Sequence, residues 1–197
     1  TMEQSGLFKS MLVAHKHCFA YSMDDLPGYS GSVGPLTLPL LTTGDIVRKP
    51  RRHSAVECNI IDEKCRELEA PGFIVKCPKP WTHFQNIVVA GKKDLDENWT
   101  DSRMCIDYRP INAETKASPY PMQRVDDCLA KAAGKSYFSR LDARSGFSQI
   151  PIATEYQPKT AFCWQGVPWM YTRAPFGLTN IPAHFQESMD TILATEG

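Results

Sequence analysis

The order of helical and strand patterns is the feature that most limits the folds open to this chain. Residues 59–70 repeat apolar side chains at helical spacing, and residues 86–108 and 160–172 each predict a β-hairpin. Two further helical patterns and a single strand over 136–141 complete the series. The order of helix, hairpin, helix, strand, hairpin and helix predicts an α+β fold.

Three helices show which side chains we expect to face a core. The first begins at Asn59, where the asparagine can cap it, and stops at Pro71-Gly72. The others follow Pro121 and Asn180. Their apolar faces are Ile61, Cys65 and Leu68 in the first, Val125, Leu129 and Ala132 in the second, and Phe185, Met189, Ile192 and Leu193 in the third.

Residues 1–58 differ from the rest because glycine and proline recur every few positions. We expect a short helix over residues 4–15, followed by an extended N-terminal arm. Such an arm packs along a partner surface or is mobile. It is not expected to form a domain by itself.

Composition excludes some classes of protein. A length of 197 residues fits one domain, or one domain with an extension. No uninterrupted apolar run approaches ~18 residues, which excludes a membrane span on sequence grounds. With 22 basic and 22 acidic side chains the net charge is zero, so any attraction to nucleic acid must come from a local basic patch.

The cysteines indicate an intracellular reducing compartment. There are seven, an odd number, and no two form a Cys-x-x-Cys pair. The segment His15-Lys16-His17-Cys18 is a single His/Cys cluster, and zinc would normally need a second ligand pair at suitable spacing. His53 and Cys58 match no standard spacing, so we expect a solvated segment at residues 15–18.

A basic cluster lies near the end of the arm. It consists of Arg48, Lys49, Arg51 and Arg52. Two interpretations are open, a solvated charged face or contact with the phosphates of a nucleic acid.

Six stretches carry a family resemblance when they are taken together, in order and spacing. They are residues 19–28 (FAYSMDDLPG), 65–74 (CRELEAPGFI), 103–112 (RMCIDYRPIN), 120–127 (YPMQRVDD), 137–150 (YFSRLDARSGFSQI) and 174–186 (APFGLTNIPAHFQ). In this register the chain resembles the reverse transcriptase of gypsy-type LTR retroelements, an RNA-directed DNA polymerase. The resemblance implies an N-terminal linker over 1–58, a fingers region over 59–135 and an incomplete palm over 136–197.

The resemblance also implies a set of site residues. Asp142 ends the predicted strand before a glycine-containing turn, which suits an exposed carboxylate, and it matches the first metal-binding aspartate of the family. Lys92 (or Lys93) and Arg103 lie on opposite arms of the first hairpin, where the family clamps the incoming triphosphate. Phe147 matches the aromatic residue that stacks under the sugar and excludes a 2′-hydroxyl. Phe176, Gly177 and residues 180–186 match the segment that lines the nucleotide and template pocket.

Several features depart from the family pattern. In the family, a Tyr-x-Asp-Asp motif lies on a palm hairpin shortly after the helix that matches residues 180–193. We expect this sequence to stop before that hairpin. Tyr21-Ser-Met-Asp-Asp25 has one residue too many and lies before the fingers, and Asp126-Asp127 falls within a helix. Positions 143 and 147 hold alanine and phenylalanine where leucine and tyrosine are commoner, and the polar finger tip at 95–102 is longer than usual.

Three functions remain open from the sequence. The chain is a truncated reverse transcriptase domain, inactive alone, whose family uses Mg²⁺ or Mn²⁺ and an RNA/DNA template-primer. Alternatively it is a domesticated, non-catalytic structural subunit that binds protein partners, or a nucleic-acid-binding remnant that uses the basic cluster.

Overall fold

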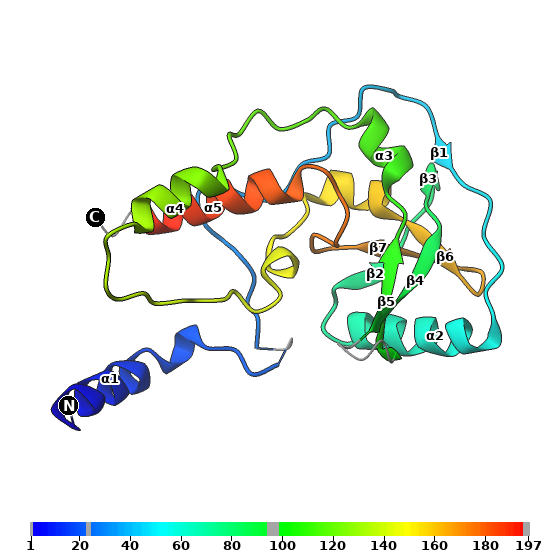
Figure 1. Ribbon diagram of the computed structural model, residues 1–197. Coiled ribbons are helices and arrows are strands. Elements are labelled where there is room, and N and C mark those ends of the chain that lie inside the picture. The colour runs from blue at the N-terminus through cyan, green and yellow to red at the C-terminus, as the bar shows by residue number, and fades with distance from the viewer. Residues whose placement is uncertain (1, 23–24, 94–98, 195–197) are drawn as a thin grey trace.

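The computed structural model describes residues 2–22, 25–93 and 99–194, which fold into helices and short strands (Figure 1). The mixture confirms the predicted α+β fold. Within the described residues, no helix is both long enough and apolar enough to span a membrane. The α-helices are α1 (Met2–Ala14), α2 (Ala55–Glu69), α3 (Arg109–Glu114), α4 (Val125–Ala132) and α5 (Ile181–Ala194). The strands are β1 (Ile46–Val47), β2 (Ile74–Lys76), β3 (His83–Phe84), β4 (Ile87–Lys93), β5 (Trp99–Ile106), β6 (Phe162–Trp164) and β7 (Val167–Tyr171). Three 3₁₀ helices complete the set: η1 (Lys16–Cys18), η2 (Gly146–Gln149) and η3 (Thr154–Thr160).

The second predicted hairpin is confirmed and forms part of a three-stranded sheet. β6 and β7 are antiparallel and are joined by Gln165 and Gly166, whose φ angles are 49° and 77°. Two successive positive φ angles are typical of a type I′ turn, whose twist suits a tight hairpin. β2 joins the other edge of β7, with Ile74 opposite Tyr171. Segments about 100 residues apart in sequence are therefore held in one sheet.

The first hairpin is also confirmed, and its strands are longer than predicted. β4 and β5 pair from Ile87 opposite Ile106 to Lys93 opposite Trp99. Part of the stretch expected to be a polar turn, residues 95–102, therefore belongs to β5. The rest of that stretch, with Asp94, lies outside the described residues.

The helix predicted to begin at Asn59 begins four residues earlier, at Ala55. Ser54 caps it: its hydroxyl accepts from the Glu57 N–H at 3.3 Å, and the Glu57 carboxylate accepts from the Ser54 N–H at 2.7 Å. This reciprocal capping box satisfies two N–H groups that the helix itself leaves unpaired. The predicted inner face is confirmed at Ile61 and Cys65, which are buried.

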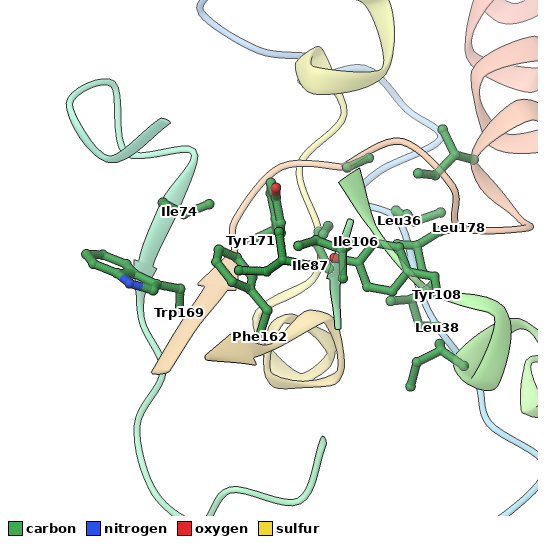
Figure 2. Packing of buried hydrophobic residues seen from close by; sticks show 14 of the residues in the cluster. Leu36, Leu38, Ile74, Ile87, Ile106, Tyr108, Phe162, Trp169, Tyr171 and Leu178 are labelled. Atoms are coloured by element: carbon green, nitrogen blue, oxygen red, sulfur yellow. The ribbon is translucent and has the colours of Figure 1, made fainter. Parts of the chain in front are cut away.

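The main hydrophobic core joins parts of the chain that are distant in sequence (Figure 2). Tyr108 and Phe162 are among its largest buried side chains, and Ile61 of α2 packs in the same cluster. Leu36 and Leu38 from the N-terminal arm are 1% and 0% exposed in it. All three predicted regions thus contribute to one core, while their bounds at 58/59 and 135/136 stay predictions.

The middle of the arm packs on the chain itself, which corrects the expectation of a partner-bound or mobile segment there. Leu36 donates its N–H to the carbonyl of Pro151 at 2.8 Å, and Leu40 forms a β-bridge with Thr115. β1 pairs in parallel with β3. By contrast, α1 lies apart from the strands in Figure 1, and the side chains described in it are nearly all exposed.

The strand predicted over 136–141 is wrong: the structure has an extended segment there that pairs with no strand in the described part of the chain. A β-strand is stabilised only when its main-chain groups find a ladder partner. Tyr137 and Leu141 are 95% and 91% exposed as a result.

Two predicted apolar faces are also less buried than expected. Val125 and Leu129 of α4 are 73% and 64% exposed, and Leu193 near the end of α5 is 68% exposed. The buried residues of α5 are instead Ile181, Ala183 and Ser188, with Phe185 and Met189 half-buried. The structure therefore leaves apolar surface uncovered on α4, on the 137–141 segment and at the end of α5.

Candidate functional site

A tight turn after Asp142 sets the position of Phe147. Ser145 adopts a left-handed conformation with φ 46°, and η2 follows at once. A Cβ atom placed on Gly146 would lie 2.9 Å from the ring of Phe185, so only glycine allows α5 to approach this closely. The Ser145-Gly146 pair thereby brings Phe147 against α5.

Asp142, Phe147 and Phe176 line one hollow of about 340 Å³. The ring of Phe147 lies 5.6 Å from the ring of Phe176 and 5.6 Å from that of Phe185, centroid to centroid. These separations are in the range of favourable aromatic contacts. Three residues predicted for the site therefore lie together, with an aromatic floor beside one exposed carboxylate, while their chemical roles stay predictions. The other lining residues are Leu141, Ala143, Gly146, Phe185 and Met189.

Gly177 does not line this hollow but turns the chain behind it. Its φ is 99°, a conformation that favours glycine, and its carbonyl accepts from the Asn112 side chain at 2.7 Å. Asn112 also accepts the N–H of Thr179 at 3.0 Å. Asn112 was given no role from sequence, although it ends the 103–112 motif, and it fixes the turn that carries Phe176.

The start of α5 is held by a second asparagine that sequence reasoning gave no separate role. Asn180 is buried, accepts the N–H of Ser118 at 3.0 Å and donates to the carbonyl of Lys116 at 2.9 Å. Further along α5, Asp190 accepts from the hydroxyl of Tyr120 at 2.6 Å, and this hydrogen bond raises the pKa of Tyr120. These contacts tie the 116–120 segment along the helix that bears Phe185.

The proposed triphosphate clamp is described only in part. Arg103 is exposed on β5 and its backbone lies opposite Ala90. Lys92 is placed by its backbone opposite Asp101, and the side chains of Lys92 and Lys93 lie outside the described residues. Neither Arg103 nor Gly177 is among the residues that line the hollow, and the clamp stays a prediction.

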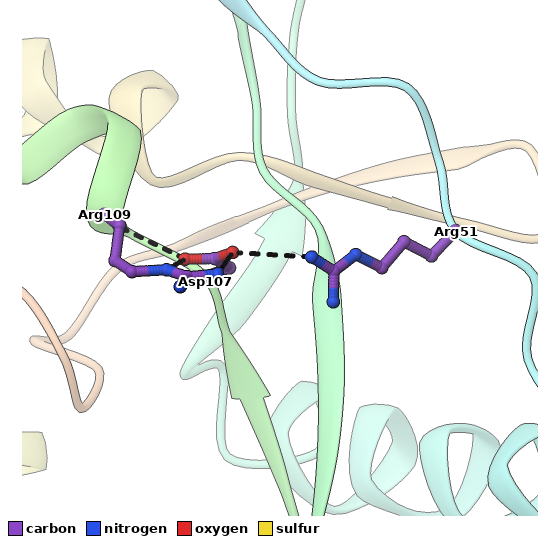
Figure 3. Close-up of polar contacts among 3 residues, drawn as sticks. All are labelled: Arg51, Asp107 and Arg109. Atoms are coloured by element: carbon purple, nitrogen blue, oxygen red, sulfur yellow. Dashed lines mark hydrogen bonds and ion pairs between the residues drawn. The ribbon is translucent and has the colours of Figure 1, made fainter.

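The basic cluster does not line the hollow, and one of its members, Arg51, forms an ion pair with Asp107 (Figure 3). Arg48, Lys49, Arg51 and Arg52 are all exposed, and Arg51 lies 4.0 Å from the carboxylate of Asp107. The guanidinium of Arg109 donates two hydrogen bonds to the same carboxylate, at 2.7 and 2.6 Å. No role was predicted for Asp107 or Arg109, although both belong to the 103–112 motif. Arg48 and Arg51 also line a cavity of about 380 Å³ with Trp164 and Gln165.

Among the described residues that line the hollow, only Asp142 offers a carboxylate to a divalent metal ion. Ions such as Mg²⁺ take several oxygen ligands, so the described residues do not complete a metal site there. The two other Asp-Asp pairs of the sequence do not supply the missing carboxylates. Asp25 accepts the N–H groups of Tyr21 and Ser22 in a local turn, Asp24 lies outside the described residues, and Asp126-Asp127 lies in the exposed first turn of α4.

Residues 91–195 match the family described as "Reverse transcriptase (RNA-dependent DNA polymerase)". The chain is 35% identical over 133 residues to the "Retrovirus-related Pol polyprotein from transposon 297" of Drosophila melanogaster, which covers 68% of the chain and 12% of that polyprotein. It is 26% identical over 188 residues to the polyprotein "from transposon gypsy" of the same organism, covering 94% of the chain and 18% of the polyprotein.

The fold of this chain is also similar to that of solved reverse transcriptase structures. The foamy viral protease-reverse transcriptase in complex with an RNA/DNA hybrid superposes with a TM-score of 0.77 at 19% identity, covering 99% of this chain and 25% of that one. The chain thus spans less than a fifth of the two polyproteins and a quarter of the viral enzyme.

The ion pair of Asp107 predicts a pH-dependent contribution to stability. Hydrogen bonds from Arg109 hold the pKa of this carboxyl below its ordinary value. The stabilisation is therefore present above the ordinary aspartate pKa of about 3.9 and is lost as the pH falls through the lowered pKa. We expect Asp107→Asn to lower the free energy of unfolding by about 1–3 kcal/mol at pH 7, and by less at pH ~3, measured by urea denaturation.

Asp126→Asn is the matched control. In the described part of the chain, the one ion pair of Asp126 is with Arg124, at 3.8 Å, and both side chains are about four-fifths exposed. Its replacement should change stability by less than about 0.5 kcal/mol at either pH. An Asp107→Asn deficit that is equally large at pH 7 and pH ~3 would contradict the ion-pair explanation.

Proposed function

Because the chain belongs to the reverse transcriptase (RNA-dependent DNA polymerase) family, we propose that it supplies the fingers and part of the palm of an enzyme that copies RNA into DNA. The observation that carries this proposal is the gathering of Asp142, Phe147 and Phe176 around one hollow. Its relatives are polyproteins of LTR retroelements, and the matched part forms a small share of each. The roles below are therefore assigned to this segment as a contributor to a larger enzyme.

The aromatic floor of the hollow suits the sugar of an incoming nucleotide. Phe147 is packed between Phe176 and Phe185, so its ring cannot swing aside freely. A fixed ring below the sugar leaves no room for a 2′-hydroxyl and therefore favours deoxynucleotides. Phe176 is 66% exposed and apolar, so it can pack against a nucleotide without hydrogen-bonding to it.

The charged groups of the nucleotide need cations. We assign Arg103 on β5 and Lys92 on β4 to the triphosphate, since basic side chains stabilise phosphate oxygens by charge-assisted hydrogen bonds. Asp142 would give one oxygen ligand to a divalent ion such as Mg²⁺ or Mn²⁺, which these polymerases use to activate the attacking oxygen. Among the residues that line the hollow, Asp142 has the only carboxylate, so we assign it one ligand of such an ion and not the whole metal site.

The template-primer is the second ligand of this function. The foamy viral enzyme of the same fold was solved with an RNA/DNA hybrid. Among the described residues Arg48, Lys49 and Arg52 form no ion pair, so their exposed side chains can reach phosphates without breaking one. They give a neutral chain the local positive patch that a nucleic acid needs.

A second candidate function is a non-catalytic subunit of a protein assembly. It is favoured by the uncovered apolar side chains of Leu129, Phe138 and Leu141, which are 64%, 71% and 91% exposed. Large exposed apolar patches mark surfaces that bind other proteins. An extended segment without a ladder partner likewise offers main-chain groups to another strand.

Nucleotide binding tests the first function directly. Replacing Phe147 with leucine keeps the apolar packing but removes the flat ring. We expect the affinity for dATP to fall by roughly threefold to tenfold, in line with about 0.5–1.5 kcal/mol for an aromatic contact, and the preference for dATP over ATP to narrow. Isothermal titration calorimetry with Mg²⁺ measures both. Phe19→Leu, at an exposed aromatic of the arm, should leave both values unchanged; an unchanged Phe147→Leu variant would reject the assigned role.

Hybrid binding tests the template-primer assignment. We expect the 197-residue chain to bind a short RNA/DNA hybrid with an affinity that weakens steeply with salt, and not to extend the primer because one carboxylate does not hold two metal ions. The double variant Lys49→Gln/Arg52→Gln should flatten the log–log salt slope by about 2. Lys131→Gln/Lys135→Gln on and after α4 is the charge-matched control. A salt-independent affinity, or an unchanged slope, would reject phosphate contact at the basic cluster.

Surface hydrophobicity tests the second candidate. The chain alone should bind a hydrophobic dye and self-associate, and Leu129→Lys should reduce both. Val56→Lys on α2 is the control, because Val56 is 69% exposed but is not part of the uncovered apolar surface of α4 and residues 137–141. Sedimentation velocity and dye fluorescence give the readout. A soluble monomer that binds no dye would rule out an obligate protein partner on this surface.

A further inference from the structure

Three metal-binding side chains meet on the arm, far in sequence from the hollow. One ring nitrogen of His15, one ring nitrogen of His17 and the sulfur of Cys18 all lie within 4.8 Å of one another. The two imidazole rings are 6.0 Å apart, centroid to centroid, and all three residues are exposed. Within residues 2–22, 25–93 and 99–194, no other group of three His, Cys, Asp or Glu side chains is as close.

The backbone explains why these side chains meet. Residues 16–18 form η1, in which Cys18 donates its N–H to the carbonyl of His15 at 2.9 Å and Phe19 donates to that of Lys16 at 3.2 Å. A 3₁₀ helix has three residues per turn, so side chains at i and i+3 eclipse one another. His15 and Cys18 therefore lie on the same side, with His17 next to them. The sequence led us to expect a solvated segment, because no second ligand pair follows at zinc-finger spacing; the tight turn gathers three ligands without one.

The chemistry of the cluster selects the kind of ion. Two imidazoles and one thiolate form the nitrogen and sulfur set that Zn²⁺ prefers, whereas Mg²⁺ and Ca²⁺ take oxygen ligands. Zinc bonds of about 2.0–2.3 Å place neighbouring ligand atoms roughly 3.3–3.6 Å apart in a tetrahedron. Small rotations of exposed side chains close the gap from 4.8 Å.

We propose that His15, His17 and Cys18 form a zinc site with three protein ligands and a fourth position open to water. The ligands come from four consecutive positions, so binding closes only short loops and costs little chain entropy. This site is independent of Asp142 and of the proposed polymerase role, because it uses different ligands and a different class of ion. Figure 1 places the segment after α1 away from the strands, where an ion would fix the turn between α1 and residue 19.

Cobalt and zinc titrations of the full chain test the site. With a phosphine reductant keeping the cysteines reduced, we expect one Co²⁺ per chain, a tetrahedral d–d spectrum and a thiolate-to-cobalt charge-transfer band. Competition against a chromophoric chelator then gives the zinc affinity. Cys18→Ser should abolish the charge-transfer band. His17→Ala should lower the zinc affinity by roughly 10-fold or more, because mutating even a residue that only hydrogen-bonds to a metal ligand typically lowers the affinity by that factor.

Two matched variants keep the test specific. Cys128 is the other exposed cysteine, and His53 is a histidine outside the cluster. Cys128→Ser and His53→Ala should bind cobalt and zinc as the unmodified chain does, and circular dichroism should show that all four variants remain folded. A charge-transfer band that survives Cys18→Ser, a zinc affinity unchanged by His17→Ala, or the absence of stoichiometric binding would overturn the proposal.

Discussion

The hydroxyl of Tyr108 makes the hydrogen bond on which the rest of the structure depends. The side chain is 2% exposed, and its hydroxyl donates to the main-chain carbonyl of Thr160 at 3.1 Å. Thr160 is also buried; its own hydroxyl accepts the N–H of Tyr171 at 2.9 Å and donates to the carbonyl of Gln157 at 2.7 Å. Burial raises the pKa of Tyr108, so the phenol stays protonated and can donate. Because a buried polar group without a partner costs about 1–3 kcal/mol, the end of β5 and the β6–β7 sheet are held in one arrangement.

The position of the hollow follows from that arrangement. Tyr108 is followed by α3. On α3 the Asn112 side chain donates to the carbonyl of Gly177 and accepts the N–H of Thr179, and these two hydrogen bonds set the turn at Gly177. That turn places Phe176 against Phe147. The same short motif holds Asp107, whose carboxylate orders Arg109 beside the basic cluster. One stretch of ten residues, 103–112, therefore positions both the wall of the proposed nucleotide site and the edge of the proposed nucleic-acid surface.

Local chemistry could be predicted from the sequence, and long-range pairing could not. The Gln165-Gly166 hairpin and the buried face of α2 at Ile61 and Cys65 follow from neighbouring residues, and the structure confirms them. The start of α2 was misplaced because its capping box, Ser54 with Glu57, precedes the apolar pattern. The links from Asn112 to Gly177 and from Tyr120 to Asp190 join residues 65 and 70 positions apart, and no local pattern encodes such a distance.

The strand predicted over 136–141 failed for a reason that bears on function. Its sequence suits a strand, but a ladder partner is a property of the surrounding fold, and the described residues offer none. The segment leads directly to Asp142, so the carboxylate lies in water at the edge of the core, where charge interactions are strongly weakened. A covering surface that paired with this segment would bury Leu141 and exclude water from Asp142 in one step. Both proposed functions therefore require another surface to cover this part of the chain. For a polymerase, the covering surface must also bring carboxylates close to Asp142. For a structural subunit, apolar side chains that pack on Leu141 and Leu129 are enough.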